Sequence, residues 1–234
     1  MTSRDLAVVV VAAGLGTRLG ADKPKAFVTL AEKTLIQHAL ENIAEVPALE
    51  QVILAVPAGH ESQTAAIVES ALAGKNVRYD VVVGGDTRQQ SIANALKVID
   101  PEVAVVLVHD AARCLITELE INRLIDACLD DEVGGLLALP LPDTLKAATN
   151  GRVSATLPRQ DKWLAQTPQM FRAGALHAAL KAQAADHFEG ITDEASAMEM
   201  AGFAPKLVVG SPHNFKVTYP PDFALAEDLL GSRK

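Results

Sequence analysis

The chain contains few of the residues that mark several classes of protein. Only 2 of its 234 residues are cysteine, and aromatic residues make up 4%. Cys114 and Cys128 fit no metal-ligand spacing, so we expect reduced thiols rather than a zinc site or a disulfide framework. No apolar run reaches the roughly 20 residues of a membrane span, and the N-terminus lacks the pattern of a signal segment. These absences predict a cytoplasmic protein.

An excess of positive charge is also absent. The chain has 21 Lys and Arg against 29 Asp and Glu, a formal net charge of −8, with no basic run or helix-long basic stripe. Such a chain repels nucleic acid. No linker rich in Pro, Gly and Ser divides the sequence, so we expect one α/β domain over residues 1–234.

Near the N-terminus, an apolar run leads directly into a glycine-rich loop. The run Val8–Ala13 is typical of a strand that is buried on both faces. The loop after it holds glycines and cations, namely Gly14, Gly16, Arg18, Gly20, Lys23 and Lys25. Backbone amides of glycines and cationic side chains bind phosphate oxygens, so we predict a phosphate site for a small anionic ligand. The alternative is a strand-to-helix turn with incidental surface lysines.

Two better-known glycine patterns do not fit this loop. No register supplies the Gly-Lys-Ser/Thr ending of a Walker loop. The dinucleotide pattern requires glycine where Leu19 stands, and the second strand, 51–56, ends without the expected carboxylate. The sequence therefore disfavours a nucleotide-dependent dehydrogenase.

Strand and helix patterns then alternate along the chain. We expect strands at 51–56, 77–83, 104–109, 134–140 and 206–209, and helices after Thr34, at 60–73, 87–98, 117–129 and 172–185, and from Tyr219. Thr34 and Thr117 each begin a capping-box pattern, and Thr192 is expected to cap a further helix. Such alternation predicts a mostly parallel sheet whose ligands bind beyond the carboxyl ends of the strands.

Chemistry-bearing residues follow two of these strands. Gly84 and Gly85 precede a helix and can bring backbone against a flat base, or can simply form a tight turn. Asp110 and Arg113 follow the next strand, as ligand-binding residues or as a surface ion pair. We expect His109 to orient its neighbours.

The alternation breaks between Pro142 and Leu157. Asn150-Gly151 suits a type I′ turn, so this segment is predicted to be a hairpin arm at about 142–160. A two-stranded hairpin cannot bury an apolar face by itself. We expect the arm to pack on a second subunit or, alternatively, to fold over the site as a lid.

Several motifs now stand in a fixed order. They are A-A-G-x-G-x-R with P-K after it, G-G-D-x-R-x-x-S, V-H-D-A-A-R, D-T, T-P-Q-x-F, T-D-E-A and N-x-K-V-T. Through them the chain resembles the 2-C-methyl-D-erythritol 4-phosphate cytidylyltransferases of the non-mevalonate isoprenoid route over nearly its whole length. The resemblance implies a Rossmann-like three-layer nucleotidyltransferase fold, a homodimer joined through the arm, and Mg²⁺ held mainly by the phosphates of CTP.

The resemblance also implies roles for particular residues. Transition-state stabilisers are Arg18 and Lys25, while Arg159 and Lys216 position the acceptor phosphate. Contacts to CTP fall on Ala12, Ala13, Gly14, Gly16, Gly85, Asp86, Ser91 and Asp110. Contacts to methylerythritol phosphate fall on Asp110, Arg113, Thr144, Arg159 and Thr192, with Thr144 and Arg159 supplied by the other subunit. Lys23 matches no family lysine and is assigned to solvent, and Cys114 stands where many relatives have proline.

The residues themselves agree with this chemistry. A phosphomonoester has a second pKa near 6, so at neutral pH it is already a nucleophile and needs no general base. Two unit charges about 4 Å apart repel by about 4 kcal/mol at an effective dielectric constant near 20, which cations must offset. Two alternatives remain: a ribitol-5-phosphate cytidylyltransferase, and a non-catalytic nucleotide-binding relative.

Overall fold

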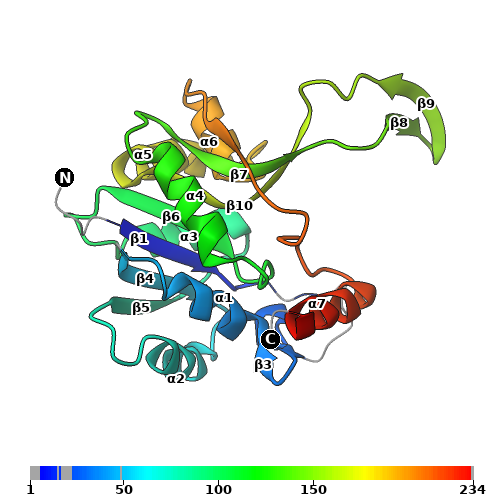
Figure 1. Cartoon of the computed structure of the whole chain (residues 1–234). Coiled ribbons are helices and arrows are strands. Elements are labelled where there is room, and N and C mark those ends of the chain that lie inside the picture. Colours follow the sequence, from blue (N-terminus) through cyan, green and yellow to red (C-terminus); the bar gives the residue numbers. More distant parts are fainter. Residues whose placement is uncertain (1–5, 15, 17–22, 48, 233–234) are drawn as a thin grey trace.

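A seven-stranded sheet forms the centre of the molecule (Figure 1). The computed structural model describes residues 6–14, 16, 23–47 and 49–232. The strands of the sheet, in chain order, are β1 (Leu6–Val11), β4 (Leu49–Val56), β5 (Arg78–Val83), β6 (Val105–Asp110), β7 (Gly134–Pro140), β10 (Trp163–Arg172) and β11 (Lys206–Val209). Their spatial order is β11-β7-β10-β6-β1-β4-β5, and only β10 pairs antiparallel to its neighbours. The predicted mostly parallel sheet is confirmed.

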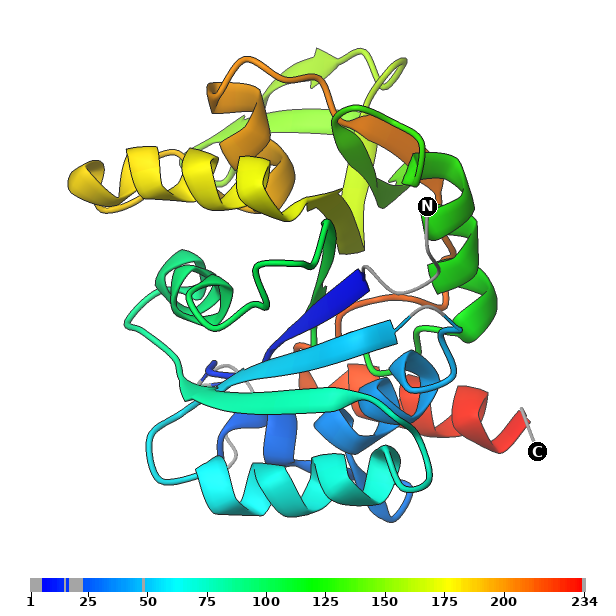
Figure 2. The same cartoon turned by 90° about the vertical axis from the view of Figure 1, so that its left-hand side faces the viewer.

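Helices cover both faces of this sheet (Figure 2). Apolar side chains of α1 (Leu35–Ile43), α2 (Glu61–Ala71) and α4 (Glu118–Cys128) pack on one face. Those of α3 (Arg88–Leu96), α5 (Ala173–Gln183) and α6 (Glu194–Met200) pack on the other. Along β1, Val8 and Val10 join the first cluster while Ala7 and Val9 join the second, as alternation along a strand requires. This is the three-layer α/β fold that the sequence predicted.

The remaining elements are short or peripheral. They are β2 (Thr29–Leu30), β3 (Lys33–Thr34), the 3₁₀ turns η2 (Lys25–Phe27) and η3 (Ala184–Asp186), the hairpin strands β8 (Leu145–Thr149) and β9 (Arg152–Leu157), and α7 (Pro220–Ser232). In the part of the chain that the structure describes, no helix combines the length and apolar character needed to cross a membrane.

Side-chain caps explain where several helices begin. Thr34 accepts a hydrogen bond from the Gln37 backbone N–H at the start of α1. At α4 the full reciprocal box forms between Thr117 and Glu120. These contacts satisfy backbone N–H groups that the first turn of a helix leaves unpaired.

The predicted cap at Thr192 is wrong. Asp193 is the N-cap of α6, and its carboxylate accepts a hydrogen bond of 2.9 Å from the Ser196 backbone N–H. The Ser196 hydroxyl in turn accepts from the Asp193 N–H at 3.1 Å, which completes a capping box one residue later than expected. Thr192 is exposed just before the helix and is not its cap.

The segment after β7 leaves the body of the molecule as a hairpin. Strands β8 and β9 pair antiparallel, and Asn150 and Gly151 both have positive φ, 50° and 75°, as a type I′ turn requires. Figure 1 shows this arm extended away from the central sheet. Its side chains are largely exposed, with 66% of Val153 accessible to solvent.

Candidate active site

A cavity of about 640 Å³ lies at the carboxyl ends of β1, β4, β5 and β6. This is the edge at which parallel α/β sheets bind ligands. Ten of the predicted site residues line it: Ala12, Ala13, Gly14, Gly16, Lys25, Gly85, Asp86, Ser91, Asp110 and Lys216. Segments as distant in the sequence as residues 12 and 216 therefore share one pocket.

The glycine-rich loop brings Lys25 to this cavity. Gly16 has φ +69°, and a Cβ on it would lie 2.6 Å from the Cβ of Lys25, so only glycine fits beside the lysine. The Lys25 backbone N–H donates to the Gly14 carbonyl at 3.3 Å. Lys23 is exposed and does not belong to the described lining of the cavity. Arg18, the other predicted transition-state residue, lies outside the described residues.

Gly84 and Gly85 lie in the loop after β5, where they allow close packing against Ala13 and against the start of α3. A Cβ on Gly84 would overlap the Cβ of Ala13, and one on Gly85 would overlap the side chain of Gln90. Neither glycine has the positive φ of many tight turns. The Ser91 hydroxyl accepts from the Gly85 N–H at 3.0 Å, so Ser91 shapes the loop as well as lining the cavity. The two glycines are therefore required by close packing within the protein, and the approach of a flat base to them stays a prediction.

Asp110, the last residue of β6, is the charged centre of the cavity. Its Oδ1 accepts from Arg88 Nε at 2.8 Å and its Oδ2 from Lys216 Nζ at 2.6 Å. Burial alone would raise the pKa of this carboxyl, but the positive charges and hydrogen bonds of Arg88 and Lys216 outweigh burial and hold it well below its usual range. Asp110 is therefore ionised at neutral pH and holds Lys216 at the cavity.

The alternative pairing of Asp110 with Arg113 is not what the structure contains. Arg113 donates through Nη1 to the Asn214 carbonyl at 2.7 Å and through Nη2 to the Ala165 carbonyl at 3.2 Å. It thereby joins β10 to the segment that carries Lys216. The pKa of Arg113 is lowered, chiefly because the side chain is largely buried.

Lys216 is aimed at the cavity by its neighbours. Asn214 is completely buried and donates through Nδ2 to the Thr167 carbonyl at 2.9 Å. Val217 is also buried, and its N–H donates to the Ala112 carbonyl at 2.9 Å. With the residues around it anchored in this way, Lys216 extends to Asp110.

Sequence reasoning missed two residues of this site as functional side chains. Arg88, the first residue of α3, donates from Nη1 and Nη2 to the two carboxylate oxygens of Glu194, at 2.5 and 3.1 Å. Burial raises the pKa of Glu194. Burial would lower the pKa of Arg88, but the carboxylates of Glu194 and Asp110 outweigh burial and raise it. Arg88 stands in the motif G-G-D-x-R and Glu194 in the motif T-D-E-A. Their presence in these motifs is the sequence feature that could have indicated a role at the site.

Four predicted residues are not part of the described cavity lining. Arg113 is bound to the Asn214 carbonyl, and Thr192 is exposed before α6. Thr144 and Arg159 belong to the arm segment and are exposed, and Arg159 donates to the Pro142 carbonyl at the base of the arm. One copy of the chain does not bring these two arm residues to its own cavity lining.

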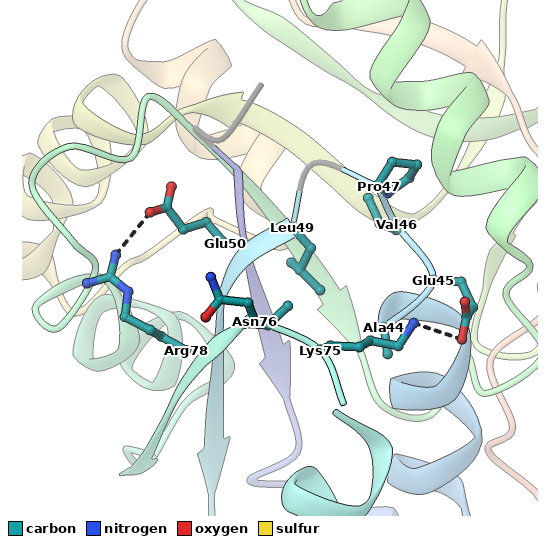
Figure 3. Close-up of a pocket in the computed structure, with 10 residues that line it drawn as sticks. Ala44, Glu45, Val46, Pro47, Leu49, Glu50, Lys75, Asn76 and Arg78 are labelled. Atoms are coloured by element: carbon teal, nitrogen blue, oxygen red, sulfur yellow. Dashed lines mark hydrogen bonds and ion pairs between the residues drawn. The ribbon is translucent and has the colours of Figure 1, made fainter. Parts of the chain in front are cut away.

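A second hollow lies at the opposite edge of the sheet, beside the amino ends of β4 and β5 (Figure 3). Its cations are paired: Lys75 lies 3.0 Å from Glu45, and Arg78 lies 3.5 Å from Glu50 and 2.6 Å from Asp100. Because these carboxylates already neutralise the cations, this hollow is a poorer anion site than the cavity at the carboxyl ends.

Known proteins resemble the chain along its whole length. The family model described as 2-C-methyl-D-erythritol 4-phosphate cytidylyltransferase matches residues 6–232. The enzyme of that name from Chromobacterium violaceum is 47% identical over 227 residues, covering 96% of this chain and 97% of that protein. A bifunctional IspD/IspF enzyme from Albidiferax ferrireducens is 49% identical over 233 residues, covering 96% of this chain but 53% of that longer protein.

A solved structure agrees with these sequence matches. The crystal structure of 2-C-methyl-D-erythritol 4-phosphate cytidylyltransferase from Thermus thermophilus superposes with a TM-score of 0.78 at 31% identity, covering 96% of this chain and 98% of that one. The fold agrees with that of this relative, and the family match spans nearly all of the described chain. The chain belongs to the 2-C-methyl-D-erythritol 4-phosphate cytidylyltransferase family.

Proposed function

We propose that this chain transfers a cytidylyl group from CTP to 2-C-methyl-D-erythritol 4-phosphate, giving 4-diphosphocytidyl-2-C-methyl-D-erythritol and pyrophosphate. Membership of the family supports this activity. The observation that carries the proposal is the shared cavity, where Lys25 and Lys216 face the same space as Gly85 and Asp110. Two cations that line one cavity of an acidic chain support a site where two phosphate compounds would meet.

The reaction is a displacement at phosphorus. An oxygen of the acceptor phosphate forms a bond to the α phosphorus of CTP, and the bond from that phosphorus to the β-phosphate oxygen breaks. Pyrophosphate leaves with the electron pair of the broken bond, so no proton has to be removed from the nucleophile. The protein therefore contributes mainly orientation and the stabilisation of negative charge.

The cavity divides this work among its segments. Ala12, Ala13 and the loop of Gly85, Asp86 and Ser91 would hold the nucleoside of CTP, since all five residues line the same cavity. Lys25, together with Arg18 from the same loop, would stabilise charge on the transferred phosphoryl group. Lys216 would guide the acceptor phosphate, which means that the phosphate competes with Asp110 for the same ammonium group.

The proposal includes Mg²⁺ bound mainly by the phosphates of CTP. The described residues contain no cluster of three His, Cys, Asp or Glu side chains able to hold a metal ion. Mg²⁺ commonly keeps several waters and takes few protein ligands, so the phosphates of CTP would supply most of its coordination. When bound, the ion would neutralise charge on the triphosphate and the leaving pyrophosphate.

The proposed unit is one cytidylyltransferase domain over residues 1–234 that acts as a homodimer in the cytoplasm. Cys114 and Cys128 are buried and not joined in a disulfide, which suits a reducing compartment. The exposed arm suits a second subunit better than a lid, because Figure 1 shows it directed away from the body of its own chain. A partner's arm would then supply Thr144 and Arg159 to this site, alongside Arg113 and Thr192 at the acceptor.

A pyrophosphate-release assay tests the activity. The purified chain is incubated with CTP and Mg²⁺ and with either 2-C-methyl-D-erythritol 4-phosphate or ribitol 5-phosphate. We expect turnover with the first acceptor and little with the second. Turnover confined to ribitol 5-phosphate would overturn the choice of acceptor, and CTP binding without turnover on either would indicate a non-catalytic relative.

A further inference from the structure

A chain of four alternating charges connects the cavity to helix α6. Glu194 accepts both terminal amines of Arg88, Arg88 Nε donates to Asp110, and Asp110 accepts from Lys216. Glu194 is only 1% exposed, so it cannot touch a ligand in the cavity and must act through Arg88. Neither Arg88 nor Glu194 is among the predicted contacts to CTP or to the acceptor.

The Arg88–Glu194 pair links two segments that are predicted to contact different substrates, CTP in one case and the acceptor in the other. Arg88 begins α3, directly after the loop of Gly85 and Asp86, and Glu194 begins α6, two residues after Thr192. A second link runs parallel to it, because Gln89 Nε2 donates to the Ile191 carbonyl at 2.6 Å. The start of α3 therefore fixes the position of the segment that presents Thr192.

The nucleotide loop, in contrast, is held by its own hydrogen bonds. Ser91 Oγ accepts from the Gly85 N–H at 3.0 Å, and Thr87 Oγ1 accepts from the Gln90 N–H at 3.0 Å. The Gly84 N–H donates to the Val56 carbonyl at 2.8 Å. None of these three contacts involves the guanidinium of Arg88, so the loop keeps its shape without it.

The geometry of the guanidinium matters as well as its charge. Its planar fork meets Glu194 through two parallel hydrogen bonds while the third nitrogen meets Asp110, which fixes the two carboxylates relative to each other. A lysine ammonium is a point charge on a flexible stem and cannot hold two carboxylates in one plane. Burying such an ion pair carries a large desolvation cost, so a contribution to folding stability does not by itself explain why the pair is there.

Resting on the proposed function, we infer that Arg88 and Glu194 are positioning residues for the acceptor phosphate. Arg88 holds Asp110, and with it Lys216, in register with the segment that carries Thr192. The pair thus aligns the two sides of the acceptor site, whereas the nucleotide loop remains independent of it.

Two conservative variants test this inference, Glu194→Gln and Arg88→Lys. Glu194→Gln keeps the volume and one acceptor but removes the charge, and Arg88→Lys keeps the charge but removes the fork. For both we expect the acceptor KM to rise about tenfold or more, because a small misplacement of the aligned groups is costly. The KM for CTP should rise much less than that for the acceptor, because only Asp110 among the predicted CTP contacts is held by Arg88, whereas a general loss of structure would raise both KM values.

Arg78→Lys is the matched control. Arg78 also meets two carboxylates, Glu50 and Asp100, but it lies at the opposite edge of the sheet. We expect this variant to keep both KM values of the unchanged chain, and thermal melting of all three variants reports on folding. Should Glu194→Gln fail to fold, Arg88→Lys decides the question.

The outcomes separate this inference from the activity on which it rests. Absence of turnover in the unchanged chain would overturn both. Turnover in the unchanged chain, with folded variants whose acceptor KM is normal or whose two KM values rise equally, would overturn the positioning role alone.

Discussion

His109 is completely enclosed behind the cavity, and its hydrogen bonds define its protonation. Its Nε2 lies 3.2 Å from the Arg113 carbonyl, and its Nδ1 lies 3.2 Å from the Thr167 hydroxyl, which itself accepts from the Asp110 N–H. A neutral ring with its proton on Nε2 satisfies all three contacts. Burial lowers its pKa to about 4; the charge of Asp110 opposes this shift, and those of Arg113 and Arg88 add to it. His109 therefore orients neighbours rather than exchanging protons, as the sequence led us to expect.

This depressed pKa predicts a dependence of stability on pH. The unfolded chain binds a proton on His109 below about pH 6.5, while the folded chain does so only near pH 4. The stabilising contribution is thus complete above about pH 6.5 and is lost as the pH falls toward 4, a total of about 3 kcal/mol. We expect urea unfolding to show this loss, and His109→Gln to remove much of it.

The comparison of variants isolates this one ring. Other titrating groups, among them Asp110 and Glu194, contribute in both proteins and largely cancel in the difference. His213→Gln is the control for replacing a histidine by glutamine, because His213 is exposed. A loss of stability as steep in His109→Gln as in the unchanged chain would show that the ring does not titrate in this way.

At the site, sequence motifs predicted many of the residues that face the cavity but not how they pair. Lys25 and Asp110 were predicted from the loop and the strand end that carry them, and Lys216 from the family resemblance. The pairing of Arg88 with Glu194 could not be predicted, because the two residues are 106 positions apart and meet only when α3 and α6 cover the same face.

At the scale of elements, strong local patterns predicted most of the fold. The buried runs gave β4, β6 and β7, and the capping pattern at Thr117 correctly marked the start of α4. Strand β10 was not predicted, because Pro168 interrupts it and its pairing with β7 shifts register between Ala165 and Gln169. Thr192 was expected as the cap because a threonine preceded the helix, although Asp193 competes for the same position.

The hairpin arm is the element expected to join two copies of the chain. An isolated two-stranded hairpin is marginal in water, so its exposed apolar side chains are expected to pack on a second copy of the chain. We expect Val153→Lys to weaken the dimer about tenfold or more, equivalent to about 1.4 kcal/mol, because it places a charge in that contact. Sedimentation over a dilution series measures the dissociation constant.

The control for this variant is Leu119→Lys. Leu119 is 70% exposed on α4, comparable with the 66% of Val153, and it lies outside the arm. Leu119→Lys should leave the dissociation constant of the dimer unchanged. At concentrations where all three proteins are monomeric, both variants should have the melting temperature of the unchanged chain. A monomer at all concentrations in the unchanged chain, or a dimer insensitive to Val153→Lys, would refute the assignment of the arm.

At the scale of the whole molecule, the sheet brings distant cations to one cavity. Parallel pairing places the carboxyl ends of β1, β4, β5 and β6 at one edge, so loops from separate parts of the chain meet there. The alternation of strands and helices predicted this edge, but the insertion of antiparallel β10 between β6 and β7 depends on long-range pairing that no local pattern contains. The central claim is that the gathered cations offset repulsion between two phosphate reactants.

The most direct test compares Lys25→Ala with Lys23→Ala. The two lysines are separated by one residue, but Lys25 lines the cavity and Lys23 is exposed outside its described lining. Steady-state measurement of kcat/KM with CTP and 2-C-methyl-D-erythritol 4-phosphate should show a loss of about a hundredfold or more for Lys25→Ala, the scale found when one charge-stabilising donor is removed. For Lys23→Ala we expect a change within about threefold. Equal losses in the two variants would contradict the account.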